Sequence, residues 1–180
     1  MKTIVIYKSN SGFVKKYADI ISSELKCDVA EASSTNISEI LKYDVIIFGG
    51  GLYAVGINGI SLIKKNIDKL KDKKVVVFAS GASPYRKEVC DEVIDKNFEK
   101  ANQKNIKFFY LRGGFDFDKL KFKHKLVMKL MKKQLEKKDN PTEDEIGMLK
   151  AFDVPVDFTS KDNAEDLINY VRSLNNKIDR

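Results

Sequence analysis

A short polar turn near the start of the chain has the clearest potential for chemistry. It holds Ser9, Asn10, Ser11 and Gly12, between a run of β-forming residues (3–7) and apolar residues that recur at helical spacing as far as residue 25. Hydroxyl groups, backbone N–H groups and the positive end of a helix dipole all favour a bound phosphate. The same pattern fits a plain helix N-cap, and the sequence leaves both interpretations open.

Two further segments, 49–57 and 80–86, follow other apolar runs and are predicted to lie beside this turn. The first holds four glycines, which let a flat ligand approach the backbone closely. Tyr53 and Tyr85 suit a planar ring stacked between them, although each tyrosine alone fits half-burial against its own helix. The predicted ligand-contact residues are Ser9, Asn10, Ser11, Gly12, Phe13, Val14, Gly51, Leu52, Tyr53, Ala54, Val55, Gly56, Ser80, Gly81, Ala82, Ser83 and Tyr85.

Other kinds of site find less support in the sequence. The two cysteines and the single histidine are too far apart in the chain for a zinc-site spacing. Gly49, Gly51 and Ala54 match a dinucleotide-binding fingerprint, but the match follows the third strand and lacks an acidic ribose partner. The first and third strands do not end in the carboxylates that a metal-binding receiver domain needs. We therefore predict neither a metal ligand nor a catalytic side chain.

The alternation of strands and helices indicates the fold class. It predicts a doubly wound α/β domain with a five-stranded parallel sheet in the order 2-1-3-4-5. The 180 residues show no linker, so we expect a single domain, 1–180, with an insertion at about 116–157 before the last helix. The expected strands are 3–7, 28–32, 44–51, 74–80 and 106–111, and the expected helices are 14–26, 58–70, one from the mid-80s to about 102, and one from about 160 or 162.

The excess positive charge lies in one segment. Residues 118–138 hold nine lysines against Asp118 and Glu136, which accounts for the whole formal charge of +7. A helix over 119–138 is either packed on its own domain with solvated lysines or lies on an anionic membrane surface. Nucleic acid is disfavoured as a partner because aromatic interleaving and a recognised fold are missing. The apolar arc of this 119–138 helix is Leu120, Val127, Met128, Leu130, Met131 and Leu135. Its lysine face is Lys121, Lys125, Lys129, Lys132, Lys133 and Lys137.

The turn at 9–14, set after an apolar strand, resembles the phosphate-binding loop of the flavodoxin superfamily, and the resemblance covers nearly the whole chain. It implies a flavodoxin-like fold and FMN as the cofactor, its phosphate held by hydroxyls and backbone amides without a metal. Flavodoxins usually carry a hydroxyl residue where this chain has Val14, so one side-chain donor to the phosphate is missing.

The basic insertion, Phe122 to Lys133, is similar to that of the menaquinone-dependent protoporphyrinogen IX dehydrogenase type of flavodoxin-like protein. This resemblance implies an FMN-dependent oxidoreductase that passes electrons from a reduced substrate to a membrane quinone. The alternative is a soluble flavodoxin-type electron carrier that serves a protein redox partner. Carriers of that type are acidic, whereas here Arg86 and Lys87 would favour reduced, anionic FMN.

The location expected from the sequence is the cytoplasm, either free or at the inner face of the cell membrane. The chain has neither a secretory signal nor an apolar stretch of about 18 residues that would span a bilayer. Its two cysteines fit a reducing compartment.

Overall fold

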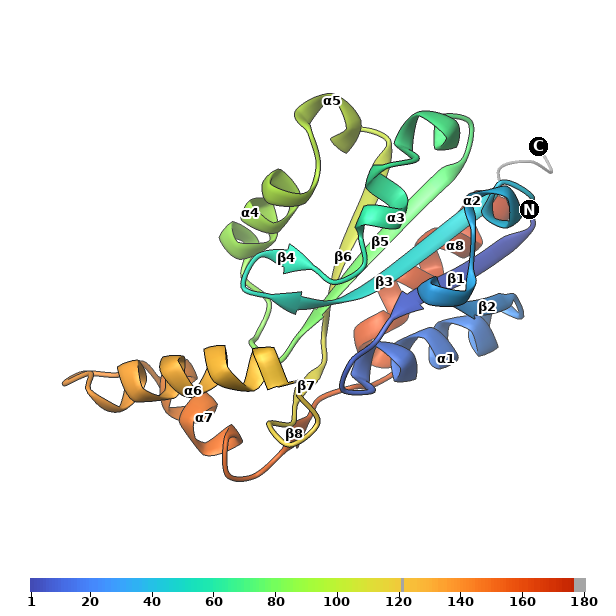
Figure 1. The fold of residues 1–180 in the computed structure, drawn as a ribbon. Helices are drawn as coiled ribbons and strands as arrows, with labels where there is room; N and C mark the ends of the chain where they lie inside the picture. The colour runs from blue at the N-terminus through green and yellow to red at the C-terminus, as the bar shows by residue number, and fades with distance from the viewer. Residues whose placement is uncertain (121, 177–180) are drawn as a thin grey trace.

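The computed structural model describes residues 1–120 and 122–176 and is built on a parallel sheet in the order β2-β1-β3-β5-β6 (Figure 1). These are the five strands of the sequence pattern, so the predicted order 2-1-3-4-5 is confirmed. A short strand, β4, pairs antiparallel with the end of β3. The strands are β1 Thr3–Lys8, β2 Asp28–Glu31, β3 Val45–Tyr53, β4 Gly56–Ile57, β5 Lys74–Gly81 and β6 Ile106–Arg112.

Helices cover both faces of the sheet (Figure 1). Successive strand residues point to opposite faces, so Val5 and Val76 pack with α1 and α8, whereas Ile4 and Val75 pack with α2, α3 and α4. The three central strands, β1, β3 and β5, are apolar along most of their length and supply both layers, whereas the outer strands β2 and β6 carry charged residues such as Asp28 and Lys107. The helices are α1 Phe13–Leu25, α2 Ile37–Ile40, α3 Ser61–Lys64, α4 Lys87–Asn97 and α8 Glu165–Asn176.

Two predicted helices are broken in the structure. The helix expected over 58–70 is α3 followed by a 3-10 turn, η2 Ile67–Leu70, because Asn66 between them has a non-helical backbone. The helix expected to reach residue 102 ends at Asn97, and α5 Lys100–Gln103 starts afresh. Phe98 takes an extended backbone there and is buried in the core, so tertiary packing overrides the helical pattern.

The segment expected as an open loop at 49–57 is largely strand. β3 continues to Tyr53 and returns as β4 through a tight turn at Ala54 and Val55. Ala54 adopts a φ of 52°, the left-handed conformation that such a turn needs. The β3–β4 hairpin carries the predicted contact residues 51–56 past the carboxyl end of the parallel sheet.

The insertion lies beyond the carboxyl ends of β3 and β5, apart from the helices that cover the sheet (Figure 1). It leaves and rejoins the sheet through an antiparallel pair, β7 Gly114–Phe115 with β8 Val156–Asp157. Between them are α6 Phe122–Glu136, which confirms the predicted basic helix, and α7 Glu143–Ala151. Lys121, predicted on its lysine face, lies outside the described residues.

None of the helices formed by residues 1–120 and 122–176 has the length and apolar character that a membrane crossing demands.

Candidate functional site

A cavity of about 530 Å³ lies at the carboxyl ends of β1, β3 and β5, between the sheet and the insertion. Open α/β sheets place their ligands at this edge. Eleven of the seventeen predicted contact residues line it: Ser11, Phe13, Val14, Gly51, Leu52, Tyr53, Ala54, Ser80, Gly81, Ala82 and Ser83.

The polar turn at 9–12 is held in shape by its own side chains. Ser9 Oγ accepts a hydrogen bond from the backbone N–H of Gly12 (3.1 Å), and Asn10 Nδ2 donates to the Tyr53 hydroxyl (2.8 Å). Gly12, with a φ of 96°, is the N-cap of α1, and within the described residues no side chain caps this helix. Ser9 and Asn10 thus shape the turn, while Ser11 lines the cavity and the first N–H groups of α1 lack a side-chain cap from the described residues, which leaves them free to bind an anion.

The glycines that end β3 do not share one role. A Cβ on Gly49 would lie 2.1 Å from the Phe78 ring, and one on Gly50 would lie 2.5 Å from the backbone oxygen of Asn58. These two glycines are therefore required by packing inside the protein rather than by a ligand. Only Gly51 of the three lines the cavity, so the predicted close approach to a flat ligand applies to that residue.

Several predicted contact residues lie off the cavity lining. Asn97 Nδ2 donates to the Val55 carbonyl (2.7 Å), which fixes the hairpin to α4. Gly56 lies next to Val55 in the same hairpin. Tyr85 is 63% exposed and packs against Tyr110, with ring centroids 6.4 Å apart. The structure thus does not form the predicted sandwich of Tyr53 and Tyr85.

The ring that faces Tyr53 comes instead from the insertion. His124 on α6 stacks on Tyr53 with centroids 4.1 Å apart and an angle of 30° between the planes. Tyr53 therefore links the polar turn, through Asn10, to the basic helix, through His124. The helical pattern of α6 held no signal that His124 would meet the β3–β4 hairpin.

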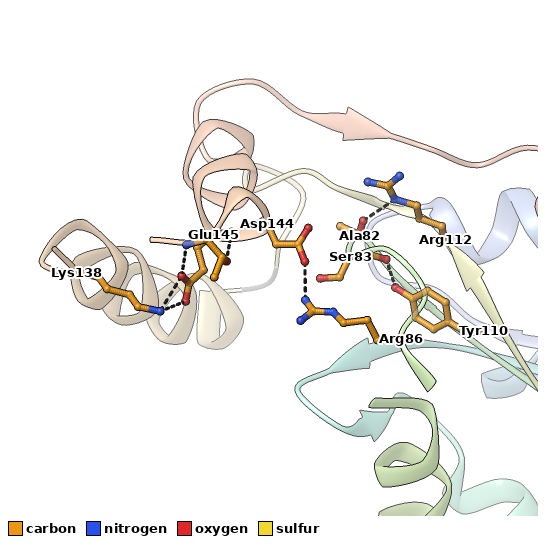
Figure 2. Close-up of polar contacts among 9 residues, drawn as sticks. Ala82, Ser83, Arg86, Tyr110, Arg112, Lys138, Asp144 and Glu145 are labelled. Carbon is orange, nitrogen blue, oxygen red and sulfur yellow. Dashed lines mark hydrogen bonds and ion pairs between the residues drawn. The ribbon is translucent and has the colours of Figure 1, made fainter. Parts of the chain in front are cut away.

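The loop at 80–86 is fixed by side chains from the end of β6, as Figure 2 shows. The Tyr110 hydroxyl donates to the Ser83 carbonyl (2.5 Å), and Arg112 Nε donates to the Ala82 carbonyl (3.1 Å). Burial raises the pKa of Tyr110 to about 12, so its hydroxyl keeps its proton at neutral pH. The pattern of β6 gave no hint that these two residues would hold the loop.

Ser80 has a buried hydroxyl that lacks a protein partner. The side chain is 6% exposed, lines the cavity, and its Oγ makes no hydrogen bond within the described part of the chain. Buried hydroxyls are normally paired, since an unmade hydrogen bond costs about 1–3 kcal/mol. The hydroxyl lies against Gly113, where an added Cβ would come within 2.2 Å of it, and it is a candidate hydrogen-bond partner for a ligand in the cavity.

The positive charge expected beside the ring is partly offset. Arg86 lines the cavity, but its guanidinium donates to Asp144 of α7 at 2.7 Å (Figure 2). Lys87 pairs with Asp91 at 2.5 Å on α4 and is not part of the lining. Arg86 thus connects the 80–86 loop to the insertion, which sequence reasoning missed because the partners are 58 residues apart.

The insertion also supplies one apolar side of the cavity, which we call the insertion wall. Four of these side chains belong to the predicted apolar arc, which the sequence predicts either to pack on its own domain or to lie on a membrane, and the structure turns them toward the loops of the cavity. The insertion wall consists of Leu120, Val127, Met128, Met131 and Met148.

The flavodoxin domain family matches residues 4–142 of this chain. The chain belongs to this family. It is similar to an uncharacterized protein of Methanocaldococcus jannaschii, at 29% identity over 160 residues that cover 84% of this chain and 95% of the relative.

Similar solved structures include a flavodoxin, WrbA-like protein of Agrobacterium tumefaciens, with a TM-score of 0.47, 18% identity, and coverage of 59% of this chain and 74% of that one. Another is the two-electron reduced flavodoxin of Megasphaera elsdenii, with a TM-score of 0.41, 19% identity, and coverage of 60% of this chain and 82% of that one.

FMN is the cofactor of this flavodoxin domain, and the cavity fits it. The uncapped start of α1 with Ser11 offers donors for the phosphate, at the end of the cavity where the polar turn lies. Gly51 and Tyr53 offer a flat surface for the ring system. The unpartnered Ser80 hydroxyl offers a hydrogen bond that the protein itself does not use.

Proposed function

We propose that this protein is an FMN-dependent oxidoreductase that passes electrons from a reduced small molecule to a quinone-type acceptor. FMN supplies the electron-transfer chemistry when it is bound, and the chain binds it, orients it and excludes water. Because the basic insertion resembles that of the protoporphyrinogen IX dehydrogenase type, protoporphyrinogen IX is the first electron donor to test.

The observation that carries this proposal is the insertion wall. An electron carrier for protein partners works best with an accessible flavin edge, whereas here α6 and α7 add apolar side chains to the cofactor cavity. A small molecule can enter a covered cavity that a protein surface cannot. The net charge of +7 favours the same choice, because electron carriers of this type present an acidic surface to their partners and this chain is basic.

The protein's own residues contribute orientation rather than proton transfer. Tyr110 and Arg112 donate hydrogen bonds to the carbonyls of Ser83 and Ala82, which holds the 80–83 segment in place. Asn10 fixes Tyr53 by donating a hydrogen bond to the Tyr53 hydroxyl. Rigid placement of these groups is what a bound cofactor requires.

We also propose that the protein works from the cytoplasm at the anionic inner face of the cell membrane. Three apolar side chains of α6 point to solvent at positions four apart, and we call them the outer ridge: Phe122, Leu126 and Leu130. Exposed Lys129 and Lys133 lie on the same helix. Apolar and basic groups together support reversible binding to anionic lipid.

Anaerobic electron transfer tests the enzyme against the carrier. Holoprotein should be reduced by protoporphyrinogen IX or another small donor, and a menaquinone analogue should reoxidise it within seconds. Rapid reduction by a flavodoxin reductase, combined with no reaction with any quinone of a panel, would establish the carrier instead.

A further inference from the structure

We infer that the insertion wall is a second binding subsite, for the apolar ring of the electron acceptor, next to the flavin. This inference rests on the proposed function and names the part of the site that binds the acceptor. The acceptor class it favours is a neutral, largely hydrocarbon ring compound such as a naphthoquinone.

The wall side chains are not used in the protein's own core. Within the described residues, the two buried clusters on either side of the sheet draw their members from the sheet and its covering helices, not from α6 or α7. Met128, Met131 and Met148 are each partly exposed and face the cavity. Apolar surface that lines a cavity without being packed is the surface that an apolar ligand can cover.

The chemistry of the wall differs from that of the opposite side. The flavodoxin-type loops present apolar side chains such as Phe13, Val14 and Leu52, but they add hydroxyls and backbone groups, which suit the phosphate and the polar edges of FMN. The wall presents only hydrocarbon and thioether sulfur, a weak acceptor. Methionine side chains are unbranched and adapt to ligands of different outline. The two sides of the cavity therefore suit two different molecules, or two different parts of one complex.

The wall is also fixed relative to the flavin loops. Arg86, in the 80–86 loop, pairs with Asp144 on α7, and Lys132 on α6 pairs with Asp153 just after α7 (3.1 Å). His124 on α6 also stacks on Tyr53 of the β3–β4 hairpin. The Arg86–Asp144 pair and the His124–Tyr53 stack thus connect α7 and α6 to the loops that bind FMN, while the Lys132–Asp153 pair ties α6 to the end of α7.

Val127 shows how an acceptor would reach the wall. It lines the cavity and is also 62% exposed, so it lies at the mouth, and it neighbours Leu126 of the outer ridge. Val127 is thus the wall residue at which an apolar molecule would enter the cavity.

Methionine-to-glutamine changes test the subsite, since they nearly keep side-chain length while making the wall polar. The variants are Met131→Gln, Met148→Gln and the pair together. Leu130→Gln is the matched control, because Leu130 lies on the same helix but is 57% exposed on the outer ridge. Binding of menadione to oxidised holoprotein is measured by equilibrium dialysis, and FMN affinity by titration of the apoprotein.

The double variant, Met131→Gln with Met148→Gln, should raise the dissociation constant for menadione about tenfold and change that for FMN less than twofold. The Leu130→Gln control should have dissociation constants close to those of the unmodified protein. In stopped-flow mixing, protein reduced with one equivalent of dithionite gives two electrons to menadione, which takes two protons from water to form the hydroquinone. The variants should need more menadione for the same rate, whereas reoxidation by ferricyanide, a charged acceptor, should be unchanged.

The outcomes separate the subsite from the proposed function. Menadione that binds in a wall-dependent way but does not reoxidise the protein upholds the subsite and refutes the quinone-type acceptor. Reoxidation by menadione with dialysis constants that the methionine changes leave unaltered overturns the subsite. So does a loss of FMN affinity alone, which would assign the wall to the cofactor. If the protein takes up no FMN, dialysis of the protein as purified still decides whether the wall binds menadione.

Discussion

Glycines at the end of β3 and in the following hairpin differ in how closely their surroundings pack on them. The Phe78 ring occupies the space where a side chain at position 49 would lie, while a Cβ on Gly56 would meet only the Tyr53 carbonyl oxygen at 3.5 Å, an ordinary contact. Position 49 thus has no room for a side chain, whereas position 56 has room for one. The sequence shows four glycines but not which of them a neighbour's ring requires.

Replacing Gly49 by Ala should destabilise the protein by about 1–3 kcal/mol, because the added methyl group forces the buried Phe78 ring to shift. Urea unfolding followed by circular dichroism measures the change. Gly56→Ala is the matched control and should stay within about 0.5 kcal/mol of the unmodified protein. Equal effects of the two changes would contradict the packing role assigned to Gly49.

Val14 stands where flavodoxins usually have a hydroxyl residue, and it is buried beside the cavity. Changing Val14 to Thr should tighten FMN binding several-fold, since it adds a donor near the phosphate. Riboflavin, which lacks the phosphate, is the internal control and should bind with unchanged affinity. Fluorescence titration of the apoprotein with both flavins makes the comparison, and an equal gain for riboflavin would show that the hydroxyl does not contact the phosphate.

Asp116 organises the start of the insertion. Its carboxylate accepts hydrogen bonds from the backbone N–H of Asp118 (3.1 Å) and of Lys119 (3.3 Å), and pairs with the Lys119 ammonium (2.8 Å). These contacts, the Lys119 side chain first, lower the pKa of Asp116 below its usual 3.8. A lowered folded-state pKa means stability that is present above about pH 3.8 and lost as the pH falls through the folded value.

The unmodified protein should therefore lose more stability between pH 5 and pH 3 than Asp116→Asn does. Urea unfolding at the two pH values gives both losses, and their difference is the contribution of this carboxylate. Identical pH dependence of the two proteins would mean that the ion pair with Lys119 does not form in solution.

At the scale of elements, α6 has two apolar sides rather than the single arc expected from its sequence. Met128 and Met131 face the cavity, whereas Leu126 and Leu130 face solvent. Two of the predicted lysine-face residues have acidic neighbours, since Lys132 pairs with Asp153 and Lys125 lies 4.0 Å from Asp118. The membrane proposal thus depends on the outer ridge with Lys129 and Lys133.

Changing Lys129 and Lys133 to Gln should weaken binding to vesicles of anionic lipid at least about tenfold, because each lysine contributes about 1 kcal/mol at such a surface. Lys64→Gln with Lys65→Gln, the exposed last residue and C-cap of α3, is the matched control. Vesicle sedimentation at low and high salt measures binding, which should weaken as salt screens the charges. Equal retention on neutral and anionic vesicles would exclude the electrostatic part of this proposal.

At the scale of the whole molecule, sequence reasoning reached the sheet order because the three central strands are largely apolar runs and strands alternate with helices along the chain. It placed eleven of the twenty-five described residues that line the cavity for a related reason, since loops after parallel strands meet at one edge. It missed the His124–Tyr53 stack and the Arg86–Asp144 pair, which depend on how the insertion folds back over that edge. Such contacts join residues 58 or more positions apart and leave no periodic trace.

The central claim is that the covered cavity serves a small-molecule acceptor rather than a protein. The most direct measurement compares the second-order rate constants for reoxidation of the reduced holoprotein by menadione and by a c-type cytochrome, under the same anaerobic conditions. Because α6 and α7 cover the cofactor cavity, menadione should react at least a hundredfold faster. A cytochrome that reacts as fast as menadione, or faster, would contradict the account and identify the protein as an electron carrier.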